Sequence, residues 1–276
     1  MKHEIDLSKY NLYTDLTLER IENNNANIEL NISKKNGIKI TKIYVDDICS
    51  KIINKSIGNY TTIEFKDITD NNNQKNVTNV LYKELCNYIN INNNDLILVI
   101  GLGNIDSTPD SLGPKVADNI LVTNHIYELG LLDSKYSRVC SIKPSVYAKT
   151  GIETSTIIKS IVNSIKPNIV ILIDSLASSS LDRLNKTIEI TDTGISPGSG
   201  IGNNRGVINK DKLGVDVIAI GVPTVVSANT LVLELTKCKK VKENDLVVTP
   251  TEIDFLIECL SKVISNSINK CLEKKK

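Results

Sequence analysis

The 276-residue chain contains no Trp, two Phe, one Met and two His. With so few aromatic side chains, its core has to be packed mainly by Ile, Leu and Val, which is typical of parallel strands buried on both faces. Because His3 and His125 are the only histidines, a three-histidine zinc site is excluded. Any Ser-His or Cys-His mechanism would depend on a single imidazole, so the sequence excludes much common hydrolase chemistry.

Neither sign of charge is in excess, because 33 basic and 32 acidic side chains leave a formal net charge of +1. No global field would therefore attract nucleic acid or an anionic membrane. The six cysteines are widely spaced and form no C-x-x-C pair, which is typical of reduced thiols in a cytosol. The polar amino terminus has no signal-peptide core, and no apolar run is long enough to cross a bilayer. We expect a cytoplasmic protein that binds neither nucleic acid nor a membrane.

Strands alternate with helices through the middle of the chain, which predicts an α/β layer fold around a largely parallel sheet. Residues 1–26 are polar and Asn-rich, and β-branched segments follow them, so additional strands are expected near the amino terminus. The expected strands are 27–33, 38–45, 60–66, 95–100, 138–142, 168–173, 187–191 and 215–220. The expected helices are 75–90, 114–129, 153–165 and 251–270.

Two aspartates are placed where such folds usually carry their chemistry, beyond the carboxyl ends of the strands. Asp110 lies in the loop after the expected strand 95–100, and Asp174 follows the expected strand 168–173. Two carboxyl groups held close together cannot both ionise cheaply, so one stays protonated while the other activates water. Such a pair can act as general base and general acid. Position alone does not select these two, because surface solvation or helix capping is the ordinary role of an aspartate.

Other motifs have simpler structural explanations. The turn at Gly101-Leu102-Gly103 lacks the third glycine of a dinucleotide fingerprint. Asp192-Thr193-Gly194 resembles the aspartic-protease triplet, but it occurs once and in an α/β chain, which favours an Asx turn. Residues 194–202 are too rich in glycine for a regular element and predict an exposed loop, in which Gly198, Ser199 and Gly200 are candidates for substrate contact. No base is evident near Ser199, and His125 is expected to be packed or partly exposed.

Several long motifs occur in a fixed order: GLGNIDSTPDSLGPKVADNILVTNHIYEL from residue 101, TGIETS at 150–155, IDSLASSSLDRLNKTIEITDTGISPGSGIGN at 173–203, VIAIGVPTVV at 217–226 and VVTPTEIDFLIECLSKVISNSIN at 247–269. With DLSKYNLYTDL near the start, they resemble the germination proteases of spore-forming bacteria. The resemblance implies an aspartic-type endopeptidase with a three-layer, twisted α/β fold similar to that of the hydrogenase-maturation endopeptidases. The catalytic aspartates of that family lie in its T-P-D and I-D-[AS]-L motifs, which are here Asp110 and Asp174.

The resemblance also implies a substrate and a precursor. The family initiates degradation of small acid-soluble spore proteins during germination, in the forespore and spore core, and is made as a zymogen that removes its own amino-terminal peptide. Its substrates are cut after the acid in the order Thr, acid, large apolar residue, two further residues, acid. Residues 14–19, TDLTLE, fit this order and predict cleavage between Asp15 and Leu16.

The domain organisation follows from that cleavage. Residues 1–15 would be a propeptide, and 16–276 a single α/β peptidase domain with a β-rich part at 27–70 and a catalytic core at 95–270. The resemblance further implies a homotetramer with no metal and no cofactor. The chain departs from the family pattern at 227–246, which is short, and at Ser227, where an acidic residue is expected. Two alternatives stay open: a metal-dependent endopeptidase of the hydrogenase-maturation type, with the two aspartates as ligands, and a non-catalytic α/β binding protein.

Overall fold

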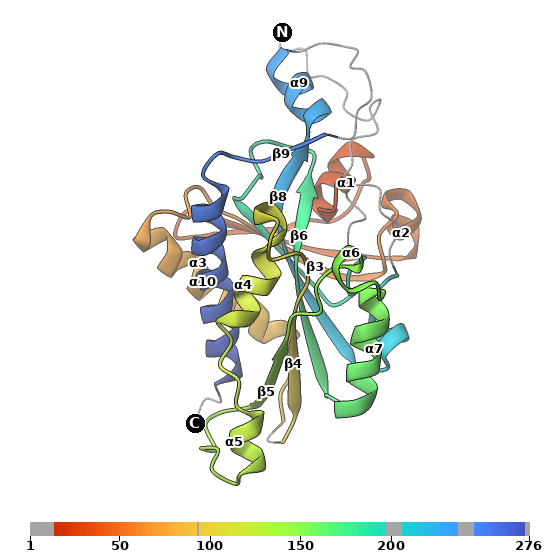
Figure 1. The fold of residues 1–276 in the computed structure, drawn as a ribbon. Coiled ribbons are helices and arrows are strands. Elements are labelled where there is room, and N and C mark those ends of the chain that lie inside the picture. The colour runs from red at the N-terminus through yellow and green to blue at the C-terminus, as the bar shows by residue number, and fades with distance from the viewer. Residues whose placement is uncertain (1–13, 93, 197–205, 237–245, 274–276) are drawn as a thin grey trace.

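The computed structural model describes residues 14–92, 94–196, 206–236 and 246–273 (Figure 1). Its strands form one mixed sheet in the order β1-β2-β3-β7-β8-β6-β4-β5, with β9 paired to β8. The strands β5, β4, β6 and β8 run parallel to one another. The pairs β8-β7, β7-β3, β3-β2, β2-β1 and β8-β9 are antiparallel. The strands are β1 (Asn31–Lys35), β2 (Ile38–Val45), β3 (Gly58–Glu64), β4 (Leu96–Gly101), β5 (Arg138–Ile142), β6 (Ile169–Ser178), β7 (Thr187–Thr191), β8 (Asp216–Ser227) and β9 (Val247–Val248).

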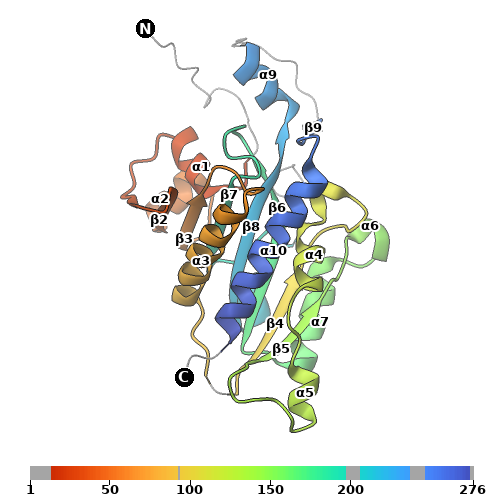
Figure 2. The same ribbon diagram turned by 90° about the vertical axis from the view of Figure 1, so that its left-hand side faces the viewer.

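Helices cover both faces of this sheet, so the α/β layer fold predicted from the sequence is confirmed (Figures 1 and 2). One face packs against α3, α4 and α10, and α3 lies beside α10. The other face packs against α7 and α8 under the parallel strands, and against α1 and α2 under the amino-terminal strands. The helices are α1 (Thr17–Asn23), α2 (Asp47–Ile53), α3 (Asn71–Tyr88), α4 (Leu112–Asp118), α5 (Asn124–Glu128), α6 (Tyr147–Thr150), α7 (Thr154–Ile165), α8 (Lys210–Leu213), α9 (Ala228–Thr236) and α10 (Ile253–Leu272).

The central parallel strands consist of buried apolar residues, as the composition indicated. Every residue of β4 is buried, and its side chains point alternately to the two faces: Ile97 and Val99 join the core under α10, whereas Leu98 and Ile100 join the core under α7. Burial on both faces holds the strand in one register, since a slip of one residue would exchange the two sets. The carboxyl ends of β4 and β6 are therefore fixed next to each other.

The first strand differs from the prediction. Alternation suggested 27–33, but β1 covers Asn31–Lys35, because Asn36 and Gly37 form a two-residue turn in which both have positive φ, 51° and 78°. That turn pairs Lys35 with Ile38 and so sets the register of the hairpin. All of β1 is exposed, which leaves the turn to fix its position.

Two further expectations need correction. The helix expected at 114–129 is two helices, α4 and α5, because Asn119 donates its side-chain amide to the carbonyl oxygen of Lys115 at 2.8 Å and the backbone N–H of Thr123 bonds to Val139 at 3.0 Å. The strand expected at 168–173 continues as β6 to Ser178, so Asp174 lies within the strand instead of after it. Among the described residues, no helix is long and apolar enough to span a membrane.

Candidate active site

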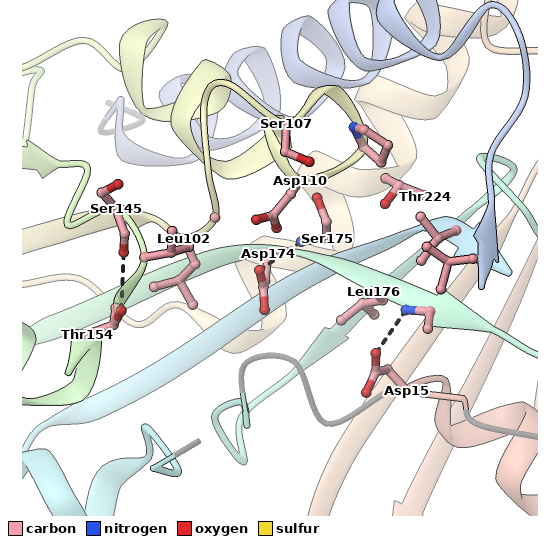
Figure 3. A pocket seen from close by; sticks show the side chains of 16 residues that line it. Asp15, Leu102, Ser107, Asp110, Ser145, Thr154, Asp174, Ser175, Leu176 and Thr224 are labelled. Atoms are coloured by element: carbon pink, nitrogen blue, oxygen red, sulfur yellow. Dashed lines mark hydrogen bonds between the residues drawn. The ribbon is translucent and has the colours of Figure 1, made fainter. Parts of the chain in front are cut away.

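Asp110 and Asp174 come together at the carboxyl ends of the parallel strands. Asp174 lies on β6, where it is paired with Gly221 of β8, and Asp110 ends a 3-10 turn, Thr108–Asp110, that follows β4. Both line one cavity of about 250 Å³. Figure 3 shows their carboxyl groups pointing toward one another across this cavity. A peptide bond entering the cavity could therefore meet both groups at once.

The turn after β4 is shaped around Asp110. The backbone N–H of Asn104 donates to the carbonyl oxygen of Asp110 at 3.0 Å and to its Oδ2 at 2.9 Å, while the N–H of Asp110 bonds to Ser107 at 2.8 Å. Gly103 has a φ of +111°, and a Cβ added there would lie 2.1 Å from the Asp110 carbonyl oxygen. Gly103 therefore allows the backbone to approach Asp110 closely.

We expect Gly103→Ala to displace Asp110 and to lower peptidase activity by at least about 100-fold, because a misplacement of about 1 Å can cost that much. Activity and thermal unfolding should be measured together. Gly151→Ala is the matched control, because Gly151 also has a positive φ, +68°, but nothing lies within 4 Å of the added Cβ. Equal activity of the two variants would contradict this role of Gly103.

Asp174 is held in a more enclosed position. Its side chain is buried, and Oδ1 accepts a hydrogen bond from the N–H of Ser175 at 2.9 Å. Ser175 and Thr224 line the same cavity, and neither of their buried hydroxyl oxygens has a hydrogen-bond partner among the described residues. Buried hydroxyl groups at a cavity wall are normally satisfied by water or by a bound ligand.

The predicted cleavage site lies at the wall of the same cavity. Asp15 is buried; its N–H donates to the carbonyl oxygen of Ala177 at 2.9 Å, and its Oδ2 accepts from the N–H of Ala177 at 2.8 Å. Ala177 lies on β6 shortly after Asp174 (Figure 3). The ammonium group of Lys55 donates to the carbonyl oxygen of Asp15, and Leu16 is fully buried. Nothing in the sequence indicated that Lys55 or Ala177 would meet this segment.

Two buried glutamates anchor the residues after Asp15. Glu19 accepts hydrogen bonds from the hydroxyl groups of Ser178, at 2.5 Å, and Ser179, at 2.8 Å, and from the N–H of Ser179 at 2.6 Å. Glu189 of β7 accepts from the N–H of Thr17 at 2.8 Å and from its hydroxyl group at 3.2 Å. These contacts fix the start of α1 against the strand that carries Asp174.

Burial raises the pKa of the Glu189 carboxyl group, against the opposing influence of Lys55 and of the Thr17 hydrogen bonds. A raised folded-state pKa of an acid means that the folded protein binds more protons than the unfolded chain, so stability falls as pH rises from the ordinary Glu value toward the folded pKa. Relative to wild type, Glu189→Gln should gain stability with rising pH in that window, by at most about 1.4 kcal/mol per pH unit. Urea unfolding between pH 4 and 8 measures this, and a difference that is flat or falls with pH would contradict it.

The other residues singled out in the sequence do not line the cavity of Asp110 and Asp174 or lie outside the described residues. Gly198, Ser199 and Gly200 are outside the described residues. His125 is exposed on α5, at the opposite end of the sheet from the cavity (Figure 1). The carboxylate of Asp192 accepts hydrogen bonds from the backbone N–H of Asn59 at 2.8 Å and from its side-chain amide at 2.7 Å, which ties it to β3. Ser227 accepts a hydrogen bond from the N–H of Thr230 at 3.1 Å and so caps α9.

Comparison with known proteins identifies the family. The family model Peptidase_A25, described as germination protease, matches residues 9–238. The chain belongs to the germination protease family. It is 39% identical to the germination protease of Clostridium tetani (strain Massachusetts / E88) over 94% of this chain and 95% of that protein. It is 42% identical to the germination protease of Bacillus cereus (strain 03BB102) over 83% of this chain and 67% of that protein.

A solved structure of lower similarity is the [NiFe] hydrogenase maturation protease HycI from Thermococcus kodakarensis KOD1. It has 16% identity to this germination protease, with a TM-score of 0.39, over 69% of this chain and 99% of that chain. Membership of the family makes the protein a peptidase, as the sequence predicted, and the two alternatives from the sequence are not favoured.

Proposed function

We propose that this germination protease cuts peptide bonds with Asp110 and Asp174 as its catalytic pair. The observation that carries the proposal is the cavity that both aspartates line, with Asp15 of the predicted cleavage site also at its wall. One carboxyl group, ionised, takes a proton from a water molecule as the water oxygen attacks the carbonyl carbon. The other, protonated, donates its proton to the leaving nitrogen as the C–N bond breaks. The chemistry uses this chain's own residues, with no metal and no cofactor.

The substrates we propose are the small acid-soluble spore proteins, whose degradation the enzyme would initiate during germination. The similarity of the chain to germination proteases supports a role in germination. Its place of action would be the cytoplasm of the forespore and the spore core, and its form a homotetramer. We propose neither nucleic acid nor a membrane as a partner.

The same active site would process the precursor, with residues 1–15 as the propeptide and 16–276 as the peptidase domain. Support comes from Asp15, which is bound to Ala177 of the strand that carries Asp174 and lines the same cavity. Cleavage between Asp15 and Leu16 would then occur within one chain, before any substrate protein has access to the cavity.

The processing site is tested by the mass of the purified full chain over time. Wild type should lose residues 1–15 and begin at Leu16. Asp15→Ala removes the carboxylate that Ala177 binds and should slow trimming by at least about tenfold, whereas Glu29→Ala, at an exposed glutamate, should trim like wild type. Trimming at another bond, or equal rates in all three proteins, would contradict the proposed site.

A further inference from the structure

The loop after α2 places a positive charge on the carbonyl group of Asp15. Asn54 adopts the left-handed conformation that ends α2, and the next residue, Lys55, is held through Ser50, whose Oγ donates to the Lys55 carbonyl oxygen at 2.7 Å. On the far side, the Tyr60 hydroxyl donates to the carbonyl oxygen of Ser56 at 2.8 Å. The loop is thus tied on both sides of Lys55, and the ammonium group reaches the Asp15 carbonyl oxygen from a defined position.

That oxygen belongs to the bond that would be cut. When water attacks the carbonyl carbon, the negative charge of the tetrahedral intermediate gathers on this oxygen, and a donor already in place stabilises it without reorganisation. A charged donor makes a stronger hydrogen bond to an oxyanion than a neutral one. Asp15 is also fixed at its N–H and its carboxylate by Ala177, so its carbonyl group cannot easily turn away from Lys55.

We propose that Lys55 is a third catalytic residue, which stabilises the oxyanion of the scissile carbonyl group. This rests on the proposed function, because it assumes cleavage between Asp15 and Leu16. Lys55 keeps its proton throughout: the proton of the attacking water goes to one aspartate, the other aspartate protonates the leaving nitrogen, and the oxyanion collapses as the C–N bond breaks. The sequence carried no signal for this role, since Lys55 lies in a short loop far from both aspartate motifs.

The test is the first-order rate of self-trimming in the full chain. Lys55→Met should slow trimming by about 10²- to 10³-fold, as expected for the loss of one oxyanion donor, and Lys55→Arg should recover part of the rate because it keeps the charge. Lys51→Met is the matched control, because Lys51 is an exposed lysine of α2 that pairs with Asp47. Thermal unfolding of each variant confirms that the fold is intact.

Trimming of Lys55→Met within twofold of wild type would overturn the role of Lys55. An Asp174→Asn chain, measured in parallel, separates the role of Lys55 from that of the aspartate pair. If Asp174→Asn is inactive while Lys55→Met is fully active, the aspartate pair stands and Lys55 is excluded. If Asp174→Asn trims normally, the proposed function itself fails.

A separate set of contacts concerns the other product of the same cleavage. The Thr14 hydroxyl group lies between two groups: it accepts a hydrogen bond from the N–H of Leu16 at 3.1 Å and donates one to Oε2 of Glu19 at 2.5 Å. Cleavage releases Thr14 with the propeptide and leaves Leu16 as the new amino terminus. Leu16 is fully buried, and Leu18 and Ile21 of α1 are packed into the core, so this end of the chain stays in place.

A buried ammonium group requires a carboxylate partner, because desolvation of an unpaired charge is costly. We infer that the new α-ammonium group of Leu16 replaces the Thr14 hydroxyl group and pairs with Glu19. The new pair would join the amino terminus of the trimmed enzyme to Ser178 and Ser179, which extend the strand carrying Asp174. Processing would thereby fix the end of that strand through a contact that the precursor does not have.

The pKa of the Leu16 α-amino group in the self-trimmed protein tests this pairing, measured from its rate of acetylation against pH. We expect a value above the ordinary range of about 7.7–8.0. In Glu19→Gln the pKa should fall below that of the trimmed wild-type protein, because the buried amine then has no carboxylate partner. An ordinary pKa in the wild-type protein would overturn the pairing while leaving the cleavage site intact. A chain that never trims would instead refute the proposed function.

Discussion

Asp174→Asn is expected to lower the rate of peptide hydrolysis by at least about 10³-fold, as is Asp110→Asn. Each substitution keeps the shape of the side chain but removes the group that takes or gives a proton, and general acid–base groups contribute about 10²- to 10⁴-fold each. Groups that act as a unit lose most of their effect when either is removed, so the double variant should be little worse than either single one. Degradation of a small acid-soluble spore protein, followed by mass spectrometry, provides the measurement.

Asp192→Asn is the control, because Asp192 directly follows β7 of the same sheet but binds Asn59 away from the cavity. It should degrade the substrate within a few-fold of wild type. All variants should be compared at temperatures well below their unfolding midpoints, so that a loss of rate reports chemistry and not unfolding. Full activity in either Asp110→Asn or Asp174→Asn would reject the pair.

Glu19→Ala should lower the free energy of unfolding of the full chain by about 3–5 kcal/mol, the usual cost of removing one partner from a buried charged network. The glutamate is only 1% exposed, and its loss leaves the hydroxyl group and the N–H of Ser179 without their acceptor. It also removes a carboxylate 3.7 Å from the partly buried guanidinium group of Arg183. Urea unfolding at neutral pH gives the value.

Glu29→Ala, at an exposed position before β1, should change the free energy of unfolding by less than about 0.5 kcal/mol. A Glu19→Ala protein as stable as Glu29→Ala would mean that Glu19 does not hold α1 to the end of β6. Because α1 begins next to the proposed cleavage site, the same result would also remove the basis for the pairing of Leu16 with Glu19.

The sequence predicted the layer architecture and the strands that carry the aspartates because these depend on local pattern. The strands β5 and β7 coincide with the expected 138–142 and 187–191, and β4 differs from its expected range by one residue at each end. The carboxyl ends of parallel neighbours share one sheet edge, so the proximity of Asp110 and Asp174 could be expected from their order in the chain.

The expectations that were wrong concern features that depend on contacts between distant segments. The extension of β6 past Asp174 requires pairing of Ala177 and Ser178 with Val225 and Val226 of β8, after an irregularity in the register. No local pattern in the motif that contains Ser178 indicated this pairing.

The contacts of Asp15 could not be predicted from local sequence either. It needs Ala177 and Lys55, and these come from two segments with no sequence relation to each other. The resemblance to a family indicated which bond to examine, whereas only the folded chain placed Asp15 at the wall of the cavity.

A crystal structure of the Asp174→Asn full chain with its amino-terminal segment uncut is the most direct measurement. It should place the carbonyl carbon of Asp15 within reach of a water molecule that lies between Asp110 and Asn at position 174, with the Lys55 ammonium group on the carbonyl oxygen. A structure in which the two side chains face different parts of the molecule, or in which the Asp15–Leu16 bond lies outside their cavity, would contradict the mechanism.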